Sequence, residues 1–126
     1  MHVLRNMISA VKPGGFVFDL QVIRPDPRVE CDGRVLCEID GRPLFRVADA
    51  AAAAVDAAIA DGTLVDEAVD DHDVCKHYRT GADLVADFAD KARKLPVDAV
   101  PAVLAIDSPC TVRERCRLRR LRIAPA

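Results

Sequence analysis

Apolar residues at the start of the chain recur with the spacing of a helix. They form one stripe over residues 2–11, made by Val3, Leu4, Met7, Ile8 and Val11. Pro13 cannot continue such a helix, and Gly14-Gly15 permits a tight turn. The pattern therefore predicts a helix that ends in a turn before residue 16.

Residues 16–23 alternate in the manner of a β-strand. One face carries Phe16, Phe18, Leu20 and Val22, and the other carries Val17, Asp19, Gln21 and Ile23. Both faces begin apolar, which predicts a strand that is covered on two sides. Asp19 and Gln21 interrupt the second face, so we expect that face to meet a polar cavity or the edge of the covering layer.

Two Asp-Gly pairs in the next segment predict a β-hairpin. We expect a strand over 34–39, a turn at Asp40-Gly41 and a second strand over 42–47, which Pro43 would place at a sheet edge. The first pair, Asp32-Gly33, could turn a shorter arm back from residues 28–31. The Ala-rich residues 47–60 are predicted to form a helix.

The second half of the chain predicts a mixture of helices and one long strand. Residues 63–73 are acidic and are interpreted as a loop around a short strand. Thr80 predicts the start of a helix that runs to about Lys94, and a short helix is expected over 97–106. Residues 111–123 alternate apolar and basic side chains, which predicts a strand with a bulge at Arg119-Arg120; a short helix is the competing interpretation.

Composition is consistent with one small domain over residues 1–126. Of the 126 residues 51% are hydrophobic but only 4% are aromatic, so Ala, Val and Leu must build the core. The five cysteines are an odd number and are interpreted as reduced thiols of a cytoplasmic protein. No apolar run approaches the roughly 20 residues of a membrane helix, so no membrane contact is expected.

Charge is distributed unevenly along the chain. Residues 111–123 contain six Arg and one Glu, whereas the whole chain has a net charge of −2. We expect this basic stretch to pair with the acidic 61–73 region. Nucleic-acid binding is not favoured, because no aromatic residues interleave the arginines.

The opening helix, the "KPGG" turn at residues 12–15 and the strand after it resemble the fifth strand region of class I S-adenosylmethionine-dependent methyltransferases. The segment "HYRTGADLVADF" and the terminal "TVRERCRLRRLRI" are similar to the following segment and to the closing strand of actinobacterial members. The resemblance implies an α/β fold: a partial Rossmann-like methyltransferase sheet made of C-terminal strands, with flanking helices and an inserted β-hairpin at about 28–47.

The Gly-rich E/D-x-G-x-G loop that holds the cofactor in this family has no counterpart in the sequence. The resemblance therefore implies a C-terminal half that is inactive alone, with S-adenosylmethionine implied by the family only. The first strand would be left with an unpaired edge. We accordingly expect a homo-oligomer or a missing N-terminal half as the partner.

Candidate site residues follow from the strand face and from one polar cluster. Asp19, His77 and Tyr78 are candidate catalytic residues, as a general base or an orienting hydroxyl, and Gln21 and His72 are candidate substrate-binding residues. The cluster "DDHDVCKH" at 70–77 could offer metal ligands, but its spacing matches no standard zinc pattern, and no metal site is predicted.

Two functional interpretations stay open at this point. The first is a methyltransferase-like protein that contributes an acceptor pocket and an oligomer surface. The alternative is a small α+β structural or partner-binding protein without enzymatic activity.

Overall fold

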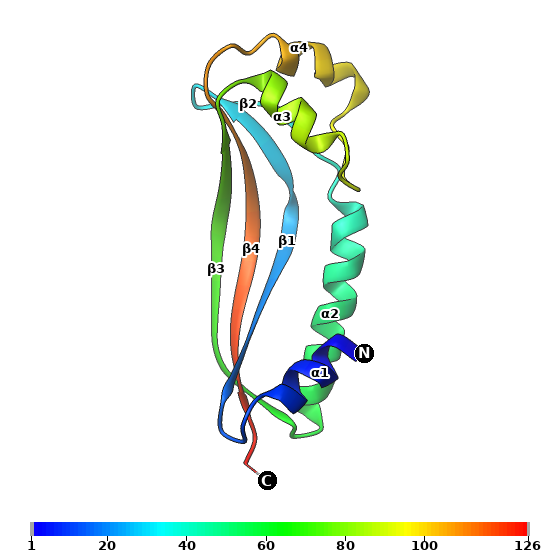
Figure 1. Ribbon diagram of the computed structural model, residues 1–126, viewed down its shortest axis with the longest axis vertical. Coiled ribbons are helices and arrows are strands. Elements are labelled where there is room, and N and C mark those ends of the chain that lie inside the picture. The colour runs from blue at the N-terminus through cyan, green and yellow to red at the C-terminus, as the bar shows by residue number, and fades with distance from the viewer. Residues whose placement is uncertain (1, 126) are drawn as a thin grey trace.

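The computed structural model describes residues 2–125 as one long, curved sheet with helices packed against it (Figure 1). The helices are α1 (His2–Ala10), α2 (Arg42–Ala60), α3 (Gly81–Phe88), the 3-10 turn η1 (Val97–Ala99) and α4 (Val100–Leu104). The strands are β1 (Phe16–Cys31), β2 (Arg34–Glu38), β3 (Leu64–Tyr78) and β4 (Cys110–Ile123). None of the described helices is long and apolar enough to cross a membrane.

The four strands lie in the order β2-β1-β4-β3, and every neighbouring pair is antiparallel. The predicted class, α/β with flanking helices, is confirmed. The antiparallel order does not fit the predicted Rossmann-like sheet, in which neighbouring strands run parallel. β1 and β3 do run in the same direction, because each is antiparallel to β4; the chain between them forms β2 and then α2.

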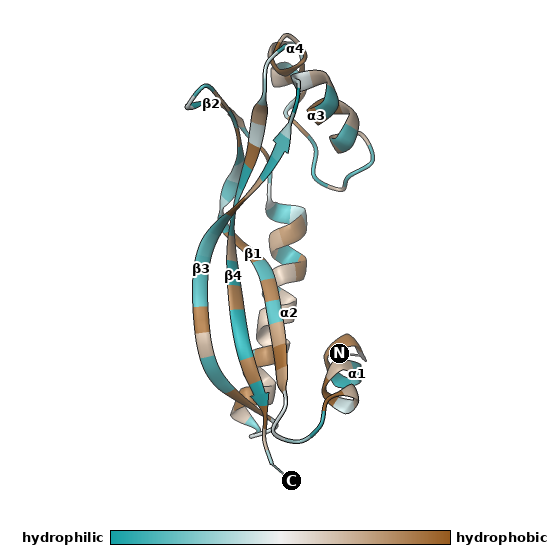
Figure 2. Cartoon of the chain, turned by 60° about the vertical axis from the view of Figure 1, so that its left-hand side comes forward, coloured by the Kyte–Doolittle hydropathy of each residue, from teal (hydrophilic) through white to brown (hydrophobic). Residues whose placement is uncertain are grey.

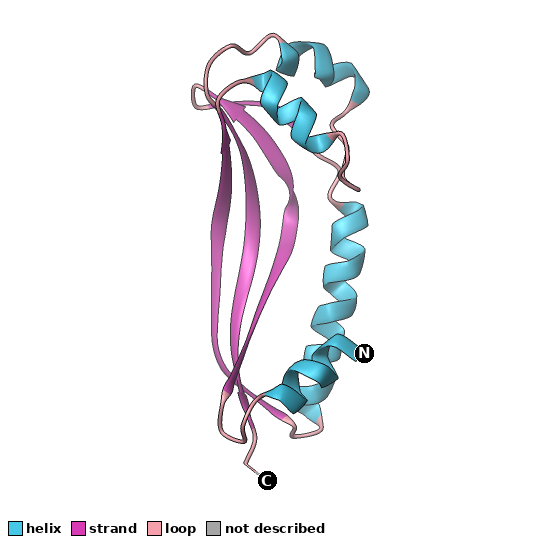
Figure 3. Cartoon of the chain, in the orientation of Figure 1, coloured by secondary structure: helices cyan, strands magenta, loops and turns pink. Residues whose placement is uncertain are grey.

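The helices cover different parts of the sheet (Figure 3). The face of β1 that carries Val17, Asp19 and Gln21, here called the inner face, turns toward α2. Near α1 the space between this face and α2 is filled by an apolar cluster of Val17, Val55, Ala58, Leu64, Leu121 and Ile123. At the other end, α3 and α4 pack over a second cluster, which includes Val29, Tyr78, Leu84, Val103 and Val112.

The opposite face of β1, here called the outer face, is not covered along its first half. Phe16, Phe18 and Leu20 on this face are 46%, 58% and 54% exposed. The prediction of a strand buried on two sides is therefore wrong for this part of the described chain. The expected polar cavity on the inner face is confirmed, as the site below shows.

The β-hairpin forms at the first Asp-Gly pair. β1 pairs with β2 through a turn in which Asp32 and Gly33 have φ angles of 51° and 74°. The predicted second arm at 42–47 is wrong, because Arg42 begins α2 with Pro43 in the first turn. Proline is tolerated there because the first amides of a helix have no intrahelical acceptor.

The acidic segment is one continuous strand and not a loop. β3 pairs with β4 along its whole length except at Glu67, where the register shifts once, between Asp66 and Ala68. The bulge predicted at Arg119-Arg120 thus lies in the partner strand instead. The strand prediction for 111–123 is confirmed, and the helical alternative is wrong.

The remaining helices follow the predicted positions more closely. Thr80 caps α3, accepting a hydrogen bond from the Asp83 amide at 3.3 Å, but the helix ends at Phe88 and not near Lys94. Gly81 permits close packing of α3 on α4, because a Cβ there would lie 1.7 Å from the Val103 carbonyl oxygen.

Candidate functional site

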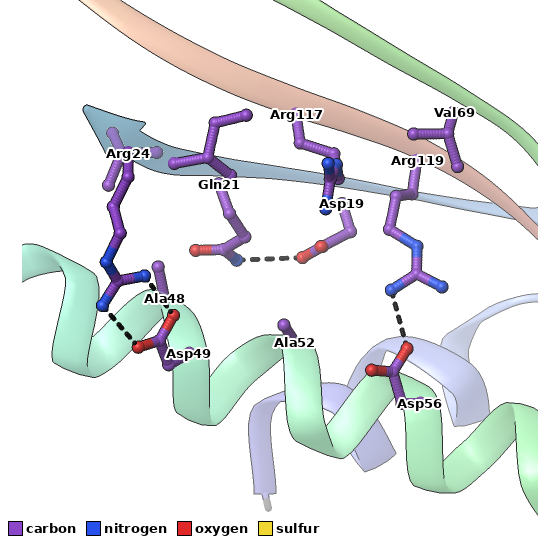
Figure 4. Close-up of a pocket in the computed structure, with 12 residues that line it drawn as sticks. Asp19, Gln21, Arg24, Ala48, Asp49, Ala52, Asp56, Val69, Arg117 and Arg119 are labelled. Atoms are coloured by element: carbon purple, nitrogen blue, oxygen red, sulfur yellow. Dashed lines mark hydrogen bonds and ion pairs between the residues drawn. The ribbon is translucent and has the colours of Figure 1, made fainter.

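A partly polar cavity lies between the inner face of the sheet and α2. It is a groove of about 530 Å³ (Figure 4). Residues from β1, β3, β4 and α2 line it: Asp19, Gln21, Val22, Ile23, Arg24, Ala48, Asp49, Ala52, Asp56, Val69, Arg117 and Arg119. The small side chains of Ala48 and Ala52 leave the space that larger residues on α2 would fill.

Asp19 and Gln21 stand side by side on β1 and face this groove (Figure 4). The Gln21 Nε2 amide donates to Asp19 Oδ1 at 2.9 Å. That bond orients the amide, so the Gln21 carbonyl oxygen and the second carboxylate oxygen of Asp19 remain as acceptors. Both residues are half-buried. The structure thus brings together two of the sequence-predicted candidates.

Ion pairs fasten the rim of the groove. Arg24 donates to both carboxylate oxygens of Asp49 at 3.2 and 3.0 Å, joining β1 to α2. Hydrogen bonding to Arg24 lowers the pKa of the Asp49 carboxyl. A bidentate pair of this kind has a fixed geometry, so the Arg24–Asp49 pair forms one border of the groove.

Arg119 ties the sheet to α2 at the other end of the groove. Its Nη1 donates to Asp56 on α2 at 3.0 Å, and its Nη2 donates to Asp66 on β3 at 3.3 Å. Arg117, the neighbouring lining residue, is held by Asp71 at 2.8 and 2.9 Å. The cationic side chains of the groove are therefore occupied by carboxylates of the protein itself.

The charges that line the groove balance, but one carboxylate has no ion pair. Three arginines, Arg24, Arg117 and Arg119, and three carboxylates, Asp19, Asp49 and Asp56, line it. Asp49 and Asp56 are paired with Arg24 and Arg119. Asp19 has no salt bridge among the described residues. A carboxylate with unused acceptors favours a ligand that carries a hydrogen-bond donor or a positive charge.

The other predicted site residues lie away from the groove. Tyr78 is buried under α3 and donates to Asp87 Oδ2 at 2.5 Å. Burial, followed by that hydrogen bond, raises the pKa of the Tyr78 phenol well above its usual range. His77 is exposed and lies 3.2 Å from the Thr111 hydroxyl through Nδ1. Among the described residues we find no shared cavity that would let these two side chains act with Asp19.

The histidine and cysteine cluster is spread over both faces of β3. His72 pairs with Cys116 in the β3–β4 register, whereas Cys75 pairs with Arg113, so the two side chains point to opposite faces. His72 Nδ1 lies 2.9 Å from Asp70 Oδ2. In the described residues no group of three candidate ligands converges on a point that could hold a metal ion.

All five cysteines are free thiols. Burial raises the pKa of Cys37, Cys110 and Cys116. A raised thiol pKa lowers the thiolate fraction, which is the nucleophilic form. These three positions therefore do not resemble a nucleophile site.

The Arg-rich strand pairs with the acidic strand, as predicted. Arg113 and Arg115 both contact Asp73, at 3.3 and 3.2 Å, and Arg122 contacts Glu67. Hydrogen bonding to Arg115 lowers the pKa of Asp73. These arginines use their donors within the protein, which leaves fewer of them for phosphate groups.

The residues present do not fit S-adenosylmethionine, the cofactor that the resemblance implies. Gly14 and Gly15 follow the C-terminal end of α1, where the helix dipole is negative and repels anions. Gly41 precedes α2, but a Cβ there would meet the Phe45 ring at 2.6 Å, so its own chain fills that space. No aromatic side chain lines the groove to stack an adenine.

Sequence reasoning missed the residues that α2 contributes to the groove. Asp49 and Asp56 are seven residues apart, which places both on one face of a helix. Ala48 and Ala52 have the spacing of neighbours along the same face. This signal was present in the sequence, but it becomes informative only once α2 is known to lie across Asp19 and Gln21.

Comparison with protein-family models, with curated proteins and with solved structures found no match to this chain.

Proposed function

We propose that this chain supplies the acceptor-binding groove of a methyltransferase-like protein and is inactive alone. The observation that carries the proposal is the groove between the sheet and α2, in which Asp19 has no ion pair and Asp19 and Gln21 offer unused acceptors. The helix, "KPGG" turn and strand that begin the chain support the methyltransferase assignment. The methyl donor would have to be held by residues outside those described here.

The chemistry of the groove points to an acceptor with a protonated amine beside a small apolar group. A protonated amine satisfies Asp19 and the Gln21 carbonyl oxygen together. The methyl groups of Ala48 and Ala52 form the apolar wall opposite them (Figure 4). Asp49 and Asp56 are not free to bind, because their charges are paired with those of Arg24 and Arg119.

Nuclear magnetic resonance of the labelled chain tests the groove directly. Titration with benzylamine is expected to shift the backbone amides of Gln21 and Ala52, whereas benzyl alcohol, with the same shape and no charge, is expected to leave them in place. Asp19→Asn should weaken benzylamine binding at least about tenfold, since a hydrogen bond to a charged group contributes about 1.5–3 kcal/mol. Asp90→Asn, an exposed carboxylate outside the groove, is the matched control.

The donor side is tested separately. Adenosine, the uncharged part of the methyl donor, added to the chain alone should leave the same amides unmoved, and a saturable shift would contradict a donor site elsewhere. The reading frames upstream of Met1 then distinguish the assignments. A D-x-G-x-G segment there supports the methyltransferase, and its absence from them favours the alternative.

That alternative is a small α+β partner-binding protein without enzymatic activity. The observation that favours it is the exposed apolar row Phe16, Phe18 and Leu20 on the outer face. It predicts no specific benzylamine binding, so the titration separates the two functions.

A further inference from the structure

The first half of β1 has a free edge. β2 pairs with β1 only from Arg28 to Cys31, so within residues 2–125 the stretch 16–27 has β4 as its only strand neighbour. Unpaired backbone groups on such an edge pair readily with a further strand. Pro25 and Pro27 have no amide hydrogen, which limits the usable edge to residues 16–24.

The hydrogen bonds of the turn show which residues point to this edge. Ile123 donates to the Gly15 carbonyl at 2.8 Å and accepts from the Gly14 amide at 3.0 Å. The backbone C=O of Gly15 therefore points to β4. By alternation, the backbone N–H and C=O groups of Val17, Asp19, Gln21 and Ile23 also point to β4. The N–H and C=O groups of Phe16, Phe18, Leu20 and Val22 point to the free edge.

Apolar surface borders the edge on both faces of the sheet. On the outer face it consists of Phe16, Phe18 and Leu20. On the inner face Val3, Met7 and Val47, which are 67%, 37% and 66% exposed, line two hollows of about 500 and 120 Å³ beside Gln21. Figure 2 shows α1 beyond the edge of β1, so a strand added there would have a helix over one face.

We propose that a second copy of this chain occupies the edge, with the two β1 strands antiparallel about a two-fold axis at Leu20. Such an axis, perpendicular to the sheet, keeps the outer faces of both copies on the same side. Residues opposite each other then have numbers that add to 40. The dimer is a continuous eight-stranded sheet.

The side chains are complementary in this register. It sets Leu20 opposite Leu20 of the second copy, Phe18 opposite Val22 and Val17 opposite Ile23. Asp19 faces Gln21 of the second copy, so a carboxylate meets an amide. Shifting the axis to residue 19 would place the two Asp19 carboxylates opposite each other, and like charges there are unfavourable.

The register also satisfies the backbone. Phe18, Leu20 and Val22 are the residues whose N–H and C=O groups point outward, and the register pairs these groups with one another. The pair at Leu20 exchanges both of its hydrogen bonds, as in the hydrogen-bonded pairs of an antiparallel sheet.

The contact depends on backbone hydrogen bonds and cross-strand pairs, because an edge-to-edge sheet leaves both of its faces open. Side chains beside the edge would meet those of the second copy along their flanks. Apolar cross-strand pairs of this kind contribute roughly 0.2–1 kcal/mol each. The inference is independent of the proposed function, since a failed dimer would leave the benzylamine titration unchanged.

Single cysteines in the full chain test the register. Opposite residues of a hydrogen-bonded pair have Cα atoms about 5.5 Å apart, which a disulfide can span. Leu20→Cys is expected to give mostly a disulfide-linked dimer under mild oxidation. Phe18→Cys is the matched control, because the introduced thiols of the two copies would lie four residues out of register, about 13 Å apart.

A mixture of Phe18→Cys and Val22→Cys proteins should cross-link, whereas each of them alone should not. Wild type measures any cross-linking through the native cysteines. The proposal is overturned if Leu20→Cys stays monomeric while circular dichroism shows a folded protein. It is also overturned if Phe18→Cys alone links as well as Leu20→Cys. An edge that instead receives a strand of another protein would give the first of these results.

Discussion

Replacing Arg93 by methionine is expected to destabilise the protein by about 3–5 kcal/mol, because it leaves the buried carboxylate of Glu114 without its ion-pair partner. Arg93 follows α3 and forms an ion pair with Glu114 on β4; the two side chains are only 10% and 18% exposed. Its guanidinium also lies 5.6 Å from the centre of the Phe88 ring. The pair fastens the α3–α4 layer to the sheet.

The size of the effect follows from burial. Methionine roughly keeps the length of the Arg93 side chain. Most of the lost stability therefore comes from the unpaired charge of Glu114. Domains are stable by about 5–15 kcal/mol in total, so the variant should lose a large part of its stability. For a chain of this length the melting temperature should fall by about 10–20 °C.

Urea unfolding of a double-mutant cycle provides the assay. Glu114→Gln removes the charge that Arg93→Met leaves unpaired. The double variant should therefore lose about 1–3 kcal/mol less free energy of unfolding than the sum of the two single variants. Arg42→Met is the control for an exposed pair: Arg42 and Asp40 are 82% and 48% exposed, and no measurable change is expected. Additive single-variant costs in the Arg93–Glu114 cycle would refute the reasoning.

Three further predictions concern packing and protonation. Gly81→Ala should cost more than about 4 kcal/mol in urea unfolding, because the added Cβ would meet the Val103 carbonyl at 1.7 Å, whereas Gly62→Ala, with open space but a φ of 84°, should cost only about 1 kcal/mol. The pKa values of Asp71, Asp73 and Asp87 are lowered in the folded state, through hydrogen bonds to Arg117, Arg115 and Tyr78 respectively. Their contribution is therefore present above the unfolded carboxyl pKa of about 3.9, and urea midpoints measured from pH 7 to pH 3 should fall as the pH drops below about 4. Tyr78 is the only tyrosine and no tryptophan is present, so absorbance at alkaline pH should show a phenol that stays protonated in the folded protein beyond the usual pKa of about 10; ionisation near 10 would contradict its buried bond to Asp87.

Local patterns in the sequence predicted the ends of the chain well. The stripe that begins at Val3, the turn at Gly14-Gly15 and the alternation through residues 111–123 correspond to α1, the turn and β4. These elements depend on periodicity and on glycine and proline, which act within a few residues.

The middle of the chain was harder to predict from the sequence, because its structure depends on contacts with residues far away along the chain. The acidic residues 63–73 have low strand propensity, yet β3 is continuous there, since its carboxylates meet the arginines of β4. Asp40-Gly41 has the composition of a hairpin turn, but the residues after it form a helix that starts at Arg42. The groove was predicted only from the β1 side, since no local pattern places α2 over Asp19.

The same limit applies to the outer face of β1. Phe16, Phe18 and Leu20 have the pattern of buried residues, and nothing within residues 2–125 covers them. The proposed dimer sets Leu20 beside Leu20 of the second copy and Phe18 beside Val22, so it extends this apolar row across the sheet without covering it.

Light scattering of the purified chain over a wide concentration range tests this claim most directly. The wild-type protein is expected to have a mass of two chains that falls toward one on dilution, and Leu20→Lys is expected to have a one-chain mass at the same concentrations. A well-folded wild-type protein that has the mass of one chain at every concentration would contradict it.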